Sequence, residues 1–204
     1  MRSPLILFLL YMLVAPIARA SDDPYLDSLW AAYNTPGQTA EQRLRTLHEI
    51  VDQARYDHPD SAHALADDLL RQATAIGNAD LIALAHRDLG GILETERDNA
   101  GALREFRLSI AIWRTVGDSA ARRGIATALN SMGIIHKNAG RLDSALALYR
   151  QSMAMQIGMR DTAGLVYAHA SIARVHEVQG QEDSALYHYT RSGELARIVG
   201  NERM

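Results

Sequence analysis

A set of small, aromatic and turn-forming residues occurs twice in the second half of this chain, with a constant offset of 40 residues. The matched positions are Gly140 and Gly180, Ala145 and Ala185, Tyr149 and Tyr189, and Ser152 and Ser192. A fixed period in this range is typical of stacked repeat proteins, in which each unit buries its apolar face against its neighbours. The period therefore constrains the fold more strongly than any other feature of the sequence.

Within each repeat, the apolar residues recur at helical spacing on both sides of a turn, which predicts two antiparallel helices. In the best-formed repeat, Met132 and Gly133 belong to the first helix, Gly140 ends it, and the second begins at Asp143. We expect repeats at about 40–78, 80–118, 124–161 and 163–200, within a solenoid over 39–204. A short helix and a turn over 21–38 are expected to cover its front. The predicted class is all-α.

Several helix ends are signalled by capping residues. Thr39 with Gln42 three residues later forms a capping-box pattern. Asp60 or Ser61 is expected to cap the second helix of the first repeat, and Gly77-Asn78 to end it.

The second repeat departs from the pattern in two ways. Gly90 precedes the equivalent Gly133 by 43 residues rather than 40, so the following linker or helix is longer. Arg97 stands where Gly140 stands in the next repeat, and we expect Asp98-Asn99 to supply the turn, since Asn and Asp tolerate left-handed backbone.

The first twenty residues have the pattern of a secretory signal peptide. Arg2 precedes a short apolar run, and Ala18 and Ala20 form an A-x-A cleavage site. We expect cleavage after Ala20 and a periplasmic or secreted protein; an uncleaved anchor is the alternative. The chain has no Cys, which excludes a lipoprotein and disulfides. Losing Arg2 and Arg19 leaves nineteen basic and twenty-four acidic residues, a net charge of −5. This acidity argues against nucleic acid as a partner.

The repeats resemble those of the tetratricopeptide repeat (TPR) family, which places small residues where two helices cross and larger residues beside them. The small residues are Gly90, Gly133, Ala173, Ala102, Ala145 and Ala185, and the larger ones are Leu89, Met132, Ile172, Phe106, Tyr149 and Tyr189. The resemblance covers about residues 40–200. It implies a right-handed α-solenoid of about four helix pairs that mediates protein–protein interactions. The 40-residue spacing resembles a longer-linker variant found in exported front parts of bacterial signalling proteins, as does the stretch Arg55–Ala62.

In stacked helix pairs, the first helix of each pair lines the concave face. Candidate partner-binding residues on that face are Arg87, Glu94, Thr127, Asn130, Lys137, Asn138, Tyr167, Arg174 and Glu177. An amide such as that of Asn130 can hold a peptide backbone through both its donor and its acceptor. An ordinary solvated helix face is the other reading of each position. The family's carboxylate clamp is not present, because Gly91 stands where an Asn is expected.

No catalytic, cofactor or metal site is predicted. His48-Glu49 and His176-Glu177 lack the second His of a zinc helix. Residues 57–67 contain three Asp and two His at Asp57, His58, Asp60, His63 and Asp67, which indicates either a solvated cap or a weak metal site.

The last predicted helix would display Ala185, Leu186, Tyr189, Leu195 and Ile198, and an exposed apolar face usually marks an interaction site. Either self-association or a continuing chain would cover it. We therefore predict an exported, non-catalytic TPR scaffold that binds a protein or peptide in its groove. The alternative is a truncated sensory ectodomain of a signal-transduction protein, of the sensor histidine kinase or transcription-regulator type.

Overall fold

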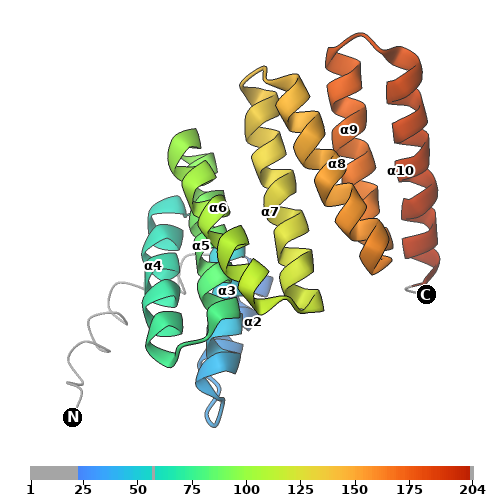
Figure 1. Cartoon of the computed structure of the whole chain (residues 1–204). Helices are drawn as coiled ribbons and strands as arrows, with labels where there is room; N and C mark the ends of the chain where they lie inside the picture. The colour runs from blue at the N-terminus through green and yellow to red at the C-terminus, as the bar shows by residue number, and fades with distance from the viewer. Residues whose placement is uncertain (1–22, 57, 203–204) are drawn as a thin grey trace. The chain divides into compact units, whose positions relative to one another are not determined.

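The computed structural model describes residues 23–56 and 58–202, and these residues form helices and no strand (Figure 1). The chain divides into two compact units, one ending at Asp98 and the other beginning at Asn99. The division falls inside the second expected helix pair. The predicted signal peptide lies outside the described residues.

The first unit contains the helices α2 (Pro24–Tyr33), α3 (Ala40–Ala54), α4 (Pro59–Ile76) and α5 (Ala79–Thr95). They pack in chain order, and α3 also lies against α5. One apolar core joins all four helices, with Leu44, Ile50, Leu69 and Ile92 fully buried. Helices α3 and α5 are thus neighbouring first helices of successive pairs, as expected for a helical repeat.

Two of the capping predictions in this unit are confirmed and one is wrong. Thr39 accepts a bond from the backbone N–H of Gln42, whose side chain bonds back to Thr39. Gly77 ends α4 in the left-handed conformation, with φ 68°. Helix α4, however, begins at Pro59, before the expected cap at Asp60 or Ser61. Proline suits the first helical position because its missing N–H would have no partner there.

The second unit contains α6 (Asn99–Val116), α7 (Ser119–Asn138), α8 (Leu142–Met159), α9 (Thr162–Val178) and α10 (Glu182–Glu202). Each helix packs on the next, and α7 also contacts α9. Helices α7 with α8 and α9 with α10 pack against each other most extensively. The all-α helical-repeat prediction is confirmed.

The predicted role of a small residue beside an aromatic one is confirmed in α7 and α8. A Cβ atom built on Gly133 would lie 2.4 Å from the Cε1 atom of Tyr149, whose ring is 1% exposed. A Cβ atom built on Gly124 would likewise lie 2.6 Å from the Cη2 atom of Trp113 in α6. Without side chains at these glycines, the helix backbones approach closely enough for both rings to be buried.

The repeated serine also has a structural role. The Ser152 hydroxyl donates to the carbonyl of Ala126 at 2.7 Å, and the Ser192 hydroxyl donates to the carbonyl of Val166 at 2.9 Å. Both bonds join the second helix of a pair to the first, 26 residues earlier. The repeat of the sequence therefore places an equivalent hydrogen bond between the two helices of each of these pairs.

Two arginines occupy turn positions that glycine holds elsewhere. Arg97 has φ 66°, close to the values of 71° at Gly140 and 69° at Gly180. The expectation that Asp98-Asn99 would supply this turn is wrong, because Arg97 itself adopts the left-handed conformation. Arg160, between α8 and α9, has φ 56°. This conformation costs a residue with a Cβ roughly 1–2 kcal/mol.

The apolar face expected on α10 is only partly exposed. Ala185 is buried against the core and Leu195 is half-buried, so these two positions were wrongly predicted to be displayed. Leu186, Tyr189 and Ile198 are exposed. Among the described residues, no helix combines the length and apolarity that a membrane span requires.

Candidate functional site

The predicted groove residues all lie on first helices, but they belong to two units. Arg87 and Glu94 lie on α5 of the first unit; Thr127, Asn130, Lys137 and Asn138 lie on α7, and Tyr167, Arg174 and Glu177 on α9 of the second. We therefore describe two surfaces, the α3–α5 face and the α7–α9 face.

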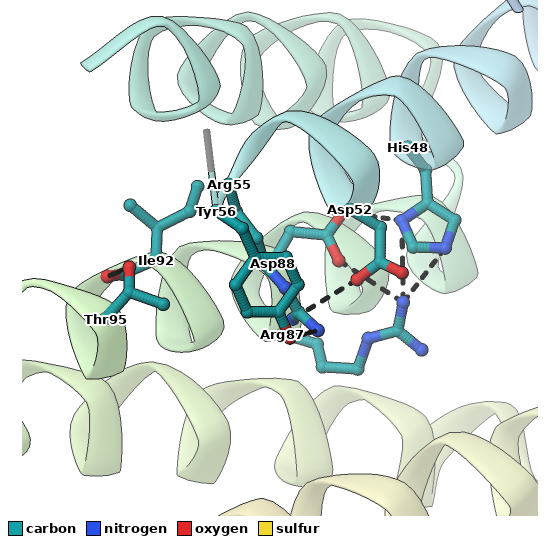
Figure 2. Close-up of polar contacts among 8 residues, drawn as sticks. All are labelled: His48, Asp52, Arg55, Tyr56, Arg87, Asp88, Ile92 and Thr95. Atoms are coloured by element: carbon teal, nitrogen blue, oxygen red, sulfur yellow. Dashed lines mark hydrogen bonds and ion pairs between the residues drawn. The ribbon is translucent and has the colours of Figure 1, made fainter. Parts of the chain in front are cut away.

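On the α3–α5 face, one histidine connects two charged residues of the neighbouring helix (Figure 2). Nδ1 of His48 lies 2.6 Å from Oδ2 of Asp88, and Arg87 donates through Nη2 to Nε2 of His48 at 2.9 Å. These distances fit a single tautomer, in which Nδ1 donates and Nε2 accepts. Arg87 also reaches Oδ1 of Asp88 at 3.2 Å. The three side chains thus fix each other's orientation.

A second arginine, Arg55, lies on the same face at the C-terminal end of α3, about two helical turns after His48 (Figure 2). Arg55 pairs with Oδ1 of Asp52 at 3.2 Å and donates to the Tyr56 hydroxyl at 2.6 Å. Its guanidinium also lies over the Tyr56 ring, 4.6 Å from the centroid. Gly91 makes room for it, since a Cβ there would lie 2.7 Å from Nη1 of Arg55.

The electrostatics of this face depend on burial. Burial raises the pKa of the Glu94 carboxyl, and the charge of Arg55 opposes that rise. The side chains of Arg87 and Arg55 are 21% and 26% exposed. A partly buried guanidinium group binds carboxylates and other planar acceptors more strongly than a guanidinium group that is fully exposed to water.

The α7–α9 face presents polar side chains with fewer mutual contacts. The side-chain oxygen of Asn130 is buried and has no hydrogen-bond partner. Thr127 bonds to its own helix, at the carbonyl of Arg123, and Tyr167 is 69% exposed. Glu177 accepts a bond of 2.8 Å from the Tyr189 hydroxyl of α10. Lys137 is half-buried, while Asn138 and Arg174 are exposed. The unused acceptor of Asn130 is the feature of this face that a ligand amide would satisfy.

Three histidines meet between α9 and α10. Nδ1 of His169 lies 2.9 Å from Nδ1 of His188, and the His188 ring stacks on that of His176 at a centroid distance of 5.7 Å. Burial lowers the pKa of both His169 and His188, and nearby positive groups, Arg191 for His169 and the other histidines for His188, lower it further. His176 bonds to Gln181 at 2.5 Å. Across the described residues, no group of three or more His, Asp or Glu is arranged to hold a metal.

The predicted groove residues include Arg87 and Glu94 but not the side chains of α3 and its C-terminal end that lie beside them. His48, Asp52 and Arg55 are spaced by four and three residues, the interval that places side chains on one helix face. That spacing was a usable signal. The burial of Asp88 could not be predicted in this way, because a charged residue in a helix is usually exposed.

No family model matches the sequence, and no curated protein is significantly similar to it. Solved structures do match. A Podosopora anserina putative kinesin light chain with nearly identical TPR-like repeats has a TM-score of 0.54 and 13% identity, over 85% of each chain. The fold is that of TPR-like repeat proteins. BtubC (BKLC) from P. vanneervenii matches with a TM-score of 0.64 and 15% identity, over 86% of this chain and 72% of that chain.

Aspartyl phosphate phosphatase F from Bacillus subtilis also matches, with a TM-score of 0.68 and 12% identity. The match covers 80% of this chain but only 42% of the phosphatase, so this chain corresponds to less than half of that protein. At such identities the likeness concerns the fold.

Proposed function

We propose that this protein is a non-catalytic scaffold that binds a protein or peptide through the exposed faces of its first helices. The observation that carries the proposal is the α3–α5 face, where Arg55 and Arg87 are half-buried and held by carboxylates and by His48. Such side chains are oriented before a partner arrives, so binding loses little side-chain entropy.

The fold supports this role. Helical repeats expose the first helices of successive pairs as one continuous surface, which suits extended ligands. One structure with this fold is a Rap protein complexed with competence and sporulation factor, with a TM-score of 0.57 and 15% identity over 54% of that chain. By analogy we propose a peptide or protein ligand here, and export of the chain through its N-terminal segment.

Affinity capture with matched variants tests the proposal. The purified chain would be used as bait in extract, beside Arg87→Ala and a control, Arg71→Ala, whose exposed side chain lies on α4. We expect a discrete partner that is retained by the wild type and the control and lost by Arg87→Ala. Equal retention by all three baits would contradict the proposal. N-terminal sequencing of exported protein tests cleavage after Ala20.

A further inference from the structure

Charge is distributed unevenly between the two units. Residues 23–98 contain six Lys or Arg and fourteen Asp or Glu, which gives a net charge of −8. Residues 99–204 contain thirteen Lys or Arg and nine Asp or Glu, which gives a net charge of +4. The overall acidity of the chain thus hides a basic C-terminal unit. A basic surface of this kind attracts anionic partners.

Four of the arginines of this unit gather at one end, which we call the arginine end. It is the end where α6 and α8 finish and α7 and α9 begin, the lower end of these helices in Figure 1. Its members, all exposed, are Arg114, Arg122, Arg123 and Arg160.

The helix dipole favours Arg114, in the last turn of α6, and Arg160, at the C-cap of α8, but it does not explain the two arginines of α7. Arg122 is the fourth residue of α7, at the end of its first turn, where the helix dipole still disfavours positive charge. Arg160 adopts φ 56° in the linker between α8 and α9, whereas the linkers between earlier repeats have Gly77 and Gly117 in this left-handed conformation. Glycine at this position would relieve the strain of the left-handed backbone.

The nearby carboxylates are engaged with helix ends. Asp118 accepts the N–H of Ala121 at 2.7 Å, and Asp161 accepts the N–H of Gly164 at 2.9 Å. Asp161 also lies 3.6 Å from Nε of Arg123, too far for a strong hydrogen bond. Two acids, one of them ion-paired with Arg123, lie beside four arginines, so the arginine end keeps a positive surplus.

A cavity of about 390 Å³ opens at this end. Its polar lining is Arg123, Arg160, Asp161 and Thr162, and its apolar walls include Met159 and Val199. The cavity is open to solvent on one side, which suits a charged group better than an apolar ligand. Two guanidinium groups in one cavity match the planar geometry of a carboxylate, which each can bind through two N–H groups.

We propose that the arginine end binds an acidic peptide segment. One carboxylate enters the cavity between Arg123 and Arg160, and further carboxylates lie against Arg114 and Arg122 outside it. Because those two arginines lie outside the cavity, a single small anion would leave them without partners, whereas an extended acidic chain engages them. None of the residues assigned above to the α3–α5 and α7–α9 faces lines this cavity, so the site can fail its test while the function proposed above stands.

Fluorescence anisotropy with a labelled poly-glutamate peptide tests the site on the full chain. Arg160→Gly removes one guanidinium and relieves the left-handed backbone, so this variant should fold at least as stably as the wild type. Arg123→Gln removes the other guanidinium. Arg104→Gln is the matched control, since it removes an exposed arginine near the opposite end of α6.

We expect saturable binding that weakens about tenfold in Arg160→Gly and in Arg123→Gln, the loss of one charged hydrogen-bonding group. In Arg104→Gln the affinity should change by less than about twofold, because an exposed distant charge contributes little. Unchanged binding in both cavity variants would overturn the proposal, and so would equal losses in all three. Inorganic phosphate that competes as well as the peptide would indicate a small-anion site instead, and tighter binding of single-stranded DNA a nucleic-acid surface; either result overturns it.

Discussion

Replacing Gly133 by Ala should destabilise the second unit, although alanine is the better helix former. The added Cβ would lie 2.4 Å from Cε1 and 2.7 Å from Cδ1 of Tyr149. An ordinary contact between carbon atoms is about 3.5–4.0 Å, so the ring or the helix must move by roughly 1 Å. Tyr149 is 1% exposed, so its ring cannot move out into solvent without disturbing its neighbours.

The magnitude follows from two opposing terms. Overpacking a filled core costs about 1–3 kcal/mol, and replacing glycine by alanine in a helix gains up to about 1 kcal/mol. Gly158→Ala isolates the second term, because a Cβ built on Gly158 of α8 meets nothing within 4 Å. Propensity cancels between the two variants, so the difference in their free energies of unfolding should be about 1–3 kcal/mol, in favour of Gly158→Ala.

Urea unfolding followed by far-ultraviolet circular dichroism measures both variants. Gly158→Ala should be as stable as the wild type or more stable, and Gly133→Ala less stable. Tyr149→Leu combined with Gly133→Ala should show a smaller loss than the two single losses added, because the clash involves the ring. Equal stability of Gly133→Ala and Gly158→Ala would refute the close-packing argument.

Three further predictions concern hydrogen bonds and protonation. Thr39→Ala removes the capping box of α3 and should cost about 1 kcal/mol in urea unfolding; a Thr39→Ser variant that loses as much would contradict this. Ser152→Ala removes a buried bond to the Ala126 carbonyl and should cost about 1–2 kcal/mol, and an unchanged unfolding midpoint would argue against the bond. The pKa values of His169 and His188 are lowered in the folded protein, so their stabilising contribution is complete above the ordinary value of 6.5 and decreases as the pH falls below it. Urea unfolding at pH 7.5 and 5.5 should show this decrease, and a His169→Gln, His188→Gln variant should show less of it.

Much of the fold could be predicted because the repeat period has a direct physical basis. Small residues, aromatic residues and serines recur where two helices must approach, fill space and bond to each other, as Gly133, Tyr149 and Ser152 show. Turn chemistry was less predictable. Arg97 adopts the left-handed conformation that sequence reasoning assigned to its neighbours, because the surrounding helices fix the turn whatever residue occupies it.

The candidate site could be predicted only in part. Helical periodicity selects the face on which Arg87 lies, but it does not show which side chains of another helix lie opposite. The contact of His48 with Asp88 joins residues 40 positions apart, and only the packing of α3 on α5 brings them together. Likewise, the positive charge at Arg123 and Arg160 is invisible in a net charge taken over the whole chain.

Site-specific photo-crosslinking tests most directly the claim that the first helices form the partner-binding surface. A photoreactive residue would be placed at Thr127 and at Tyr167, exposed positions of α7 and α9, and for comparison at Ala147 and Ala154, exposed positions of the second helix α8. We expect one discrete crosslinked partner from α7 and α9 and none from α8. Crosslinks of equal yield from α8, or from α8 alone, would contradict it.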